Sequence, residues 1–442
     1  MATTYLSRTQ GTGNRQIFTY SAWIKRSDLG QGFLFQGYTS TSSFVHIKFD
    51  SNNKLQVFGK TGGSDQMDLV TSRVFRDVGS FYNVVVAIDT TQTTDTNRVK
   101  VYINGVQETS FSTTSYPSVN ANLEINVSGY TNYIGAQYGT QAYYGGLMSY
   151  VAFVDGTQEL PGIFGETDST TGEWEIKTGI TPSVAWGNNG FLILKNGNSL
   201  TDESSNSNNF TLGGGTLTKS EDNPSNVFAT LNPLDVSRLA NTDNTFSNGN
   251  LTVTDGSSNY LLTQSTLAAT TGKFYWEVKI NATTSTSVSG VGVCDFDNFL
   301  RNDGAANTAY GWIYAPDGDK RHNGTATAYG DTYAANDIIG IALDMTNGFL
   351  YFSKNGTWQN SGNPESGASG TNAAYGSVSG TIGSHAYDGS STQTHEYSFN
   401  FGNGFFGTTA VSSAGTNASG NGIFEYDTPT GYTALSTKGL NL

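Results

Sequence analysis

Residues 336–359 read NDIIGIALDMTNGFLYFSKNGTWQ, and this stretch indicates the fold class. An apolar run ends at Asp344, a second strand-like run follows the pair Asn347-Gly348, and the pair Asn355-Gly356 closes that run. Asn-Gly is typical of tight hairpin turns, because both central positions of such a turn take positive φ. The stretch therefore predicts a meander of three antiparallel strands.

Residues 84–107, VVVAIDTTQTTDTNRVKVYINGVQ, repeat the same order of features. An apolar run ends at Asp89, a polar loop follows, and alternating apolar residues lead into Asn104-Gly105. The spacing from Asp to the closing Asn is 104 − 89 = 15 here and 355 − 344 = 11 in the later stretch. Since only the loop length differs, we expect one sandwich plan to occur twice.

The composition favours an almost all-β protein with more than one domain. The chain has 442 residues, with 54 Gly, 8 Pro, 25 Phe and 24 Tyr, which suits short strands joined by tight turns. Because 22 basic and 36 acidic residues give a formal charge of −14, we expect no nucleic-acid partner.

The compartment is inferred from the cysteine count and the N-terminus. Cys294 is the single cysteine, so no intramolecular disulfide can form, and its apolar neighbours predict a buried side chain. The first residues show neither a basic segment nor an apolar signal segment. No run reaches the roughly 18 apolar residues of a membrane span, so membrane insertion is not expected. We expect synthesis in a reducing cytoplasm.

Residues 1–156 are predicted to form the first sandwich. Short alternating strands bounded by Gly, Ser, Asn and Asp carry the motifs FTYSAWIKRS, RDVGSFYNVVVAIDTT, KVYINGVQ, NYIGAQ and YYGGLMSYVAFVDG. In this order they resemble concanavalin A-like jelly rolls of the laminin G type. The resemblance implies two stacked antiparallel sheets.

Residues 157–227 are polar and turn-rich, with one short strand expected at Gly190 to Leu194. They carry too few apolar residues to fold alone and are too long for an ordinary linker. We expect an extended bridging segment that packs on one or both sandwiches.

Residues 228–442 are predicted to form the second sandwich. GKFYWEV, YGW, the stretch 336–359, FNFG and TPTGYTAL resemble, in that order, a SPRY domain. The resemblance implies a further concanavalin A-like sandwich and a role in interactions. A Gly/Ser-rich insertion at 408–421 departs from the family pattern, and its role stays open.

The pairing of the two domains resembles large structural proteins of tailed phages, particularly those that infect marine bacteria. It implies a non-enzymatic virion protein, a fibre, tail appendage or capsid-decorating protein, assembled in the host cytoplasm as a homo-oligomer. Its expected partners are other virion proteins and host surface polysaccharide. The alternative is a free lectin or a laminarinase-type glycoside hydrolase.

Catalysis is not expected. Laminarinase-type enzymes hold their carboxylates on one strand face as Glu-x-Asp-x-Glu or Glu-x-Asp-x-x-Glu, and the chain has neither pattern. The nearest approach is Glu166 and Asp168 followed by Glu173 and Glu175, in a turn-rich loop. The four histidines, His46, His322, His385 and His395, lack metal-ligand spacing.

Calcium is considered because lectin-like jelly rolls bind it through loop carboxylates. Candidate ligands are Asp89, Asp95, Asn97, Asp295, Asp297 and Asp303. At strand ends Asp also caps turns by accepting from backbone N–H groups, and we favour this role for Asp89 and Asp344. No cofactor is therefore predicted, with calcium as the alternative.

Sugar binding would use exposed aromatic rings that stack on pyranose faces. The candidate clusters are Tyr143 with Tyr144, beside Gly145-Gly146, and the trio Tyr310, Trp312 and Tyr314. The competing interpretation is that alternate members of these clusters are core residues.

Overall fold

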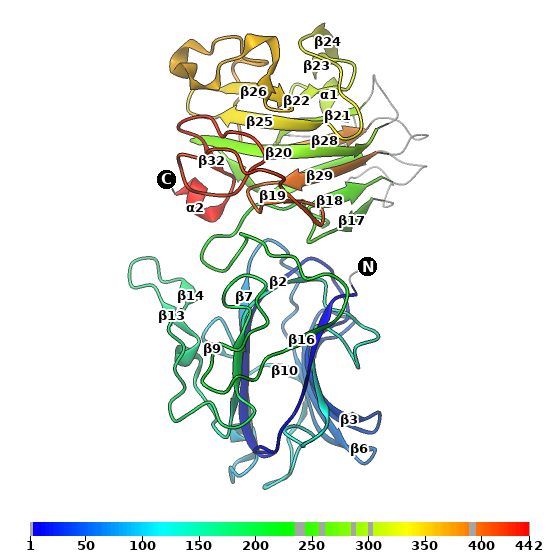
Figure 1. Cartoon of the computed structure of the whole chain (residues 1–442), viewed down its shortest axis with the longest axis vertical. Coiled ribbons are helices and arrows are strands. Elements are labelled where there is room, and N and C mark those ends of the chain that lie inside the picture. The colour runs from blue at the N-terminus through cyan, green and yellow to red at the C-terminus, as the bar shows by residue number, and fades with distance from the viewer. Residues whose placement is uncertain are drawn as a thin grey trace. The chain divides into compact units, whose positions relative to one another are not determined.

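The computed structural model describes residues 3–234, 244–255, 261–283, 289–298, 304–388 and 395–441 (Figure 1). The chain divides into two compact units, residues 1–219 and 220–442. Both are built of antiparallel sheets, which confirms the all-β prediction.

The N-terminal unit is a sandwich of two large sheets. Figure 1 shows β7 in one layer and β3 and β6 in the other. The eight-stranded sheet has the order β10 (Phe111–Ser115), β6 (Ser64–Thr71), β5 (Leu55–Thr61), β4 (Ser43–Phe49), β3 (Gly32–Ser40), β11 (Thr131–Ile134), β1 (Tyr5–Thr9), β16 (Thr211–Gly214). The six-stranded sheet has the order β15 (Phe191–Ile193), β12 (Gly146–Asp155), β2 (Ile17–Arg26), β7 (Tyr82–Asp89), β8 (Val99–Ile103), β9 (Val106–Gln107). A separate hairpin pairs β13 (Gly165–Thr167) with β14 (Trp174–Ile176).

Strand alternation explains the core of this unit. Phe18, Tyr20, Ala22 and Ile24 of β2 face the other sheet and join its main hydrophobic cluster, as predicted. The opposite face of β2 is buried too, because residues after β12 cover it. Thr19 Oγ1 donates to the carbonyl of Thr157 at 2.8 Å.

Residues 157–219, assigned above to the bridging segment, belong to the N-terminal unit. Strands β15 and β16 extend its two sheets by pairing with β12 and β1. Phe164 and Ile180 pack with Val85 and Ala152 in a second cluster on the outer side of the six-stranded sheet. The segment therefore gains its stability from the sandwich that it covers.

The C-terminal unit also has two large sheets. One has the order β17 (Thr245–Ser247), β18 (Thr252–Thr254), β29 (Glu396–Asn400), β20 (Lys273–Ala282), β25 (Ile338–Asp344), β26 (Phe349–Lys354), β27 (Thr357–Trp358), with β32 (Thr433–Ala434) pairing parallel to β20. The other has the order β19 (Leu261–Ala269), β28 (Ile382–Asp388), β21 (Ser289–Asp295), β22 (Gly311–Tyr314), β23 (Asp319–His322), β24 (Thr325–Ala328). A small hairpin pairs β30 (Phe405–Phe406) with β31 (Thr409–Ala410).

The predicted meander is present as β25, β26 and β27. Asn355 and Gly356 have φ of 48° and 81°, and Asn104 and Gly105 have φ of 48° and 77°, as an Asn-Gly turn requires. The expected two-residue turn at Asn347-Gly348 is instead a loop from 345 to 348, because β25 ends at Asp344.

Helices are short in the described part of the chain. They are α1 (Gly304–Asn307), α2 (Thr437–Leu440) and the 3-10 turns η1 (Asp95–Asn97), η2 (Pro161–Ile163), η3 (Gln359–Ser361) and η4 (Pro364–Ser369). No helix in the described ranges has the length and apolar content needed to cross a bilayer.

The C-terminal unit begins before residue 228. Val227 N donates to Thr437 Oγ1 at 3.0 Å, and Phe228 N donates to Asp222 Oδ1 at 3.2 Å, so residues 220–227 fold with the end of the chain. The 408–421 insertion lies along the segment that follows it. Gly415 N donates to the Phe424 carbonyl, and Thr416 N donates to Asp427 Oδ1 at 2.6 Å.

Candidate functional site

Tyrosine side chains gather on the outer face of the eight-stranded sheet of the N-terminal unit. Strands β1, β11 and β3 are neighbours there and carry Tyr5, Tyr133 and Tyr38. Leu6 and Ile134, adjacent in sequence to Tyr5 and Tyr133, pack in the core. Because successive strand residues point to opposite faces, these tyrosines project away from the core.

The loop between β11 and β12 adds Tyr138 and Tyr143 to the same face. Tyr138 has φ of 53°, in the left-handed region, and its backbone N donates to Gln36 Oε1 at 2.9 Å. A residue with a Cβ pays roughly 1–2 kcal/mol for this conformation, so the surrounding contacts must hold it there.

These five residues, Tyr5, Tyr38, Tyr133, Tyr138 and Tyr143, form what we term the tyrosine row. The distances between consecutive ring centroids are 6.4 Å for Tyr143–Tyr5, 6.1 Å for Tyr5–Tyr133, 6.3 Å for Tyr133–Tyr38 and 4.6 Å for Tyr38–Tyr138. Phe44 continues the row 6.4 Å from Tyr138, followed by His46 and Phe58. The rings thus follow one another across neighbouring strands.

All five tyrosines are half-buried, so part of each remains at the surface. Tyr143 O–H donates to the Gly139 carbonyl at 3.4 Å, whereas the other four hydroxyls make no hydrogen bond to described residues. Burial raises the pKa of Tyr38, and the neighbouring phenols Tyr138 and Tyr133 raise it further. Tyr38 is therefore a neutral phenol at pH 7, able both to donate and to accept hydrogen bonds.

Two lysines lie at the phenylalanine end of this face. Lys48 Nζ lies 5.2 Å from the Phe33 ring centroid, and Lys60 Nζ lies 5.8 Å from that of Phe58. His46 is buried at this end, where desolvation and then the charge of Lys48 lower its pKa to about 3. The imidazole is thus neutral at physiological pH.

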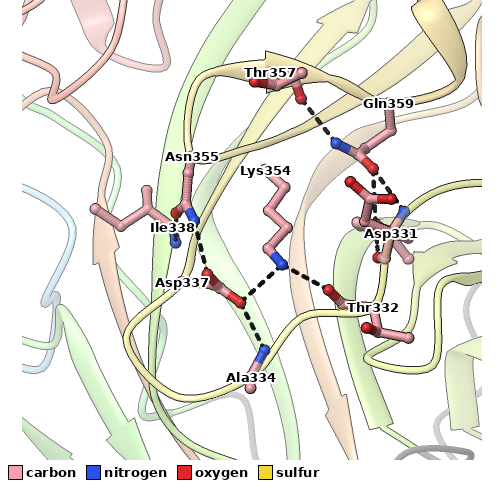
Figure 2. A network of polar contacts seen from close by, with 10 residues as sticks. Asp331, Thr332, Ala334, Asp337, Ile338, Lys354, Asn355, Thr357 and Gln359 are labelled. Atoms are coloured by element: carbon pink, nitrogen blue, oxygen red, sulfur yellow. Dashed lines mark hydrogen bonds and ion pairs between the residues drawn. The ribbon is translucent and has the colours of Figure 1, made fainter.

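A polar network in the C-terminal unit is shown in Figure 2. Lys354 Nζ donates to the Thr332 carbonyl at 2.7 Å and lies 3.3 Å from Asp337 Oδ2. Asp337 also accepts from Ala334 N at 2.8 Å and from Asn355 Nδ2 at 2.7 Å. Burial acts to raise the pKa of Asp337, but these hydrogen bonds and the ammonium outweigh it and lower the pKa.

The same network reaches Gln359, whose Oε1 accepts from Asp331 N at 2.7 Å and whose Nε2 donates to the Thr357 carbonyl at 2.9 Å. The contacts hold the loop before β25 against the β26–β27 hairpin (Figure 2). Since these polar groups bind one another, we interpret the network as a support for the loops rather than as a ligand site.

Glu277 on β20 is a second buried polar centre of this unit. Its carboxylate accepts from Glu425 N and Tyr426 N, both at 2.8 Å, and from Tyr275 O–H and Asn400 Nδ2, both at 3.1 Å. Desolvation is the larger effect and raises the pKa of Glu277 to about 7, whereas these hydrogen bonds act in the opposite direction. The carboxylate therefore joins the C-terminal segment to the central strand.

Comparison with protein families gives two matches. Residues 2–159 match the concanavalin A-like lectin/glucanases superfamily, and residues 273–403 match the SPRY domain. The chain contains both domains. Domains of these two kinds are typically non-catalytic.

Solved structures with partial similarity include single domains and a pentraxin. The SPRY domain of human HERC1 shares 20% identity over 35% of this chain and 91% of its own, with a TM-score of 0.29. The TRIM65 PSpry domain shares 17% identity over 39% of this chain and 91% of its own, with a TM-score of 0.28. The native heptameric SAP-like pentraxin from Limulus polyphemus shares 17% identity over 34% of this chain and 70% of its own, with a TM-score of 0.25.

The predicted pair Tyr143 and Tyr144 separates in the concanavalin A-like domain. Tyr143 joins the tyrosine row, whereas Tyr144 is 7% exposed, packs in the core and donates from its hydroxyl to the Lys25 carbonyl at 2.9 Å. Neighbouring residues in an extended chain point to opposite sides, so only one of the pair can lie on the outer face. The sugar-stacking prediction is therefore corrected for Tyr144.

The predicted trio of the SPRY domain needs a similar correction. Tyr310 is 40% exposed, but Trp312 is 6% exposed and stacks on His322 with a centroid distance of 5.2 Å. Tyr314 is fully buried, and its hydroxyl donates to the Asp331 carbonyl. Because both faces of β22 are covered, Trp312 and Tyr314 offer no ring face to a sugar.

The residues proposed as calcium ligands in the concanavalin A-like domain have separate local roles. Asp89 accepts from Thr91 N at 3.0 Å, Thr91 Oγ1 at 2.6 Å and Gln92 Nε2 at 2.6 Å, which caps the turn after β7. Asp95 is exposed in η1, where it accepts from Thr96 N. Asn97 ends η1.

In the SPRY domain, Asp295 accepts from Asp297 N at 3.1 Å, Thr381 N at 3.2 Å and Asn298 Nδ2 at 2.8 Å. Asp297 accepts from Thr381 Oγ1 at 2.5 Å. Asp303 lies outside the described residues. Within the described ranges no group of three His, Cys, Asp or Glu side chains is placed to hold a metal ion.

The carboxylates weighed for hydrolysis lie on an exposed hairpin. Glu166 of β13 pairs with Glu175 of β14, and both are exposed. Asp168 accepts from Thr170 N and Thr171 N in the connecting turn, which lowers its pKa. Asp168 therefore serves the turn, and Glu166 and Glu175 lie on the exposed hairpin.

Proposed function

We propose that this chain is a non-enzymatic structural protein of a tailed-phage virion, a fibre, tail appendage or capsid-decorating protein, and that its concanavalin A-like domain contacts host surface glycan. The observation that carries the binding role is the tyrosine row, a surface of half-buried rings of which four have hydroxyls that make no hydrogen bond to described residues. Such rings suit the flat apolar faces and the hydroxyl groups of sugars.

The virion role is supported by the combination of the two domains and by their construction. Rigid sandwich cores carry loops that can vary without unfolding the protein, which suits a particle surface. Other virion proteins are the proposed partners, and homo-oligomeric assembly in the host cytoplasm is proposed with them. The buried Cys294 thiol is consistent with assembly in a reducing compartment.

A free lectin is the second candidate, because the tyrosine row would serve it equally well. Cryo-electron microscopy of purified particles separates the two. The virion proposal predicts ordered density for this chain at stoichiometric, symmetry-related positions on capsid or tail. Particles that lack the chain, with all of it free in the lysate, would overturn the virion proposal and leave the lectin.

A further inference from the structure

We propose that the tyrosine row of the concanavalin A-like domain is the binding site for an uncharged polysaccharide chain that runs across strands β1, β11 and β3. The inference rests on the glycan-binding part of the proposed function and gives it a site and a ligand class.

The placement favours an extended ligand. Neighbouring strands lie about 4.8 Å apart, and the rings step from β1 to β11 to β3 and then to Tyr138 in the loop. A linear chain of sugar rings laid across the strands meets one tyrosine after another. A compact ligand would leave most of the row uncovered.

The chemistry favours a sugar over an apolar partner. Rings placed only for packing would be fully buried or would use their hydroxyls within the protein, whereas Tyr5, Tyr38, Tyr133 and Tyr138 keep theirs free of described partners. Each offers an apolar ring and a polar tip side by side. A glycan likewise presents C–H faces next to hydroxyl groups.

The charge distribution favours a neutral chain. Outward residues beside the row on β1 and β16 are hydroxyl side chains, with Ser7 Oγ and Thr211 Oγ1 3.5 Å apart. The cations Lys48 and Lys60 lie instead over the rings of Phe33 and Phe58, and Lys60 pairs with Asp65 at 3.2 Å. An acidic polysaccharide would find no cation over the tyrosine rings in the described residues.

The row is also held in place before any ligand arrives. Gly139 has φ of 72°, and a Cβ there would lie 2.7 Å from the Tyr5 ring and 3.1 Å from the Tyr133 ring. The loop can therefore lie close against both rings only with glycine at this position. Together with the left-handed Tyr138, this fixes the ring positions and lowers the entropy lost on binding.

Affinity electrophoresis of the full chain tests the proposal. The neutral gels contain an uncharged polysaccharide, which is dextran, laminarin or galactomannan, and a further gel at the same pH contains the acidic polysaccharide alginate. The wild-type chain is expected to be retarded in at least one neutral gel. The double variant Tyr38→Ala/Tyr133→Ala should bind that polysaccharide at least about tenfold more weakly. Tyr130→Ala, which removes a tyrosine that is 44% exposed outside the row, should bind like the wild type.

A second variant guards against a folding defect. Tyr38→Phe/Tyr133→Phe keeps both rings but removes two free hydroxyls, so it should bind about threefold more weakly than the wild type and unfold at the same denaturant concentration. If both double variants unfold normally and bind like the wild type, the chain binds glycan at a site other than the tyrosine row, and the proposal is refuted. If the wild type is retarded in no neutral gel, the glycan part of the proposed function fails as well, while particle microscopy still decides the virion role.

Two other outcomes would also overturn the proposal. Retardation only in alginate would show that the ligand is acidic. A dimer mass for the wild type by light scattering, reduced to a monomer mass in Tyr38→Ala/Tyr133→Ala, would show that the row binds a second copy of the chain.

Discussion

The rings of Tyr38 and Tyr138 lie 4.6 Å apart, although one comes from β3 and the other from the loop before β12. The contact depends on the left-handed backbone of Tyr138 and on the hydrogen bond from its N–H to Gln36. The ring of Tyr138 is therefore held in place at the expense of backbone strain. A substitution that removes the ring and relieves the strain can weaken binding with little change in the free energy of unfolding.

Tyr138→Asn should leave stability within about 1 kcal/mol of wild type and still weaken glycan binding. Asparagine tolerates the left-handed conformation better, which offsets the lost ring contacts. Urea unfolding and affinity electrophoresis measure the two effects. Loss of stability by more than about 3 kcal/mol with unchanged binding would show that the ring serves packing alone.

His46 predicts a loss of stability on acidification. Its folded pKa of about 3 lies below the unfolded value of about 6.5, so the unfolded chain takes up the proton first as the pH falls. This contribution is fully present above about pH 6.5 and is lost progressively down to about pH 3.

His46→Phe should remove that dependence, because phenylalanine suits a site among Phe33, Phe44 and Phe58. Between about pH 7.5 and about pH 5, wild type should lose about 2 kcal/mol more stability than the variant. Urea unfolding at both pH values gives the difference. Equal losses in the two proteins would contradict the assignment of a neutral, buried imidazole.

Glu277→Gln should destabilise the SPRY domain by roughly 2–4 kcal/mol. The carboxylate accepts four hydrogen bonds, and an amide would turn its NH₂ group toward two of those donors. Glu175→Gln on the exposed β14 is the matched control and should change stability by less than about 0.5 kcal/mol. Equal stabilities of the two variants in urea would refute the structural role of Glu277.

Asp89→Ala should cost about 1–2 kcal/mol because it removes the three hydrogen bonds that cap the turn after β7. If Asp89 acts only as a cap, excess calcium and then EDTA should leave the wild-type Tm unchanged. A rise in Tm with calcium that disappears in Asp89→Ala would instead make this carboxylate a metal ligand.

Local patterns in the sequence predicted many of the strands, but of the four strands β13–β16 only β15 was expected. The Asn355-Gly356 turn and the core face of β2 follow from two-residue periodicity and from turn chemistry, which depend on neighbouring residues alone. The loop at 345–348 escaped prediction because Asp344 accepts from Asn347 N at 3.0 Å and thereby widens the turn.

The tyrosine row could not be assembled from sequence in the same way. Tyr5, Tyr133 and Tyr38 become neighbours only through the order β1–β11–β3, in which no two adjacent strands are consecutive in the chain. The alternation with core residues could have shown that each of these tyrosines points outward. The sequence did not show that their strands are neighbours. The buried Tyr314 and Trp312 were proposed because sequence does not show what covers the second face of β22.

Competition for adsorption tests the central claim most directly. Purified full chain is added to host cells before the phage, and the particles that fail to adsorb are counted. The account predicts that wild-type chain and Tyr130→Ala block adsorption, whereas Tyr38→Ala/Tyr133→Ala does not. Equal blocking by wild type and the double variant, or blocking by none of the three, would contradict attachment through the tyrosine row.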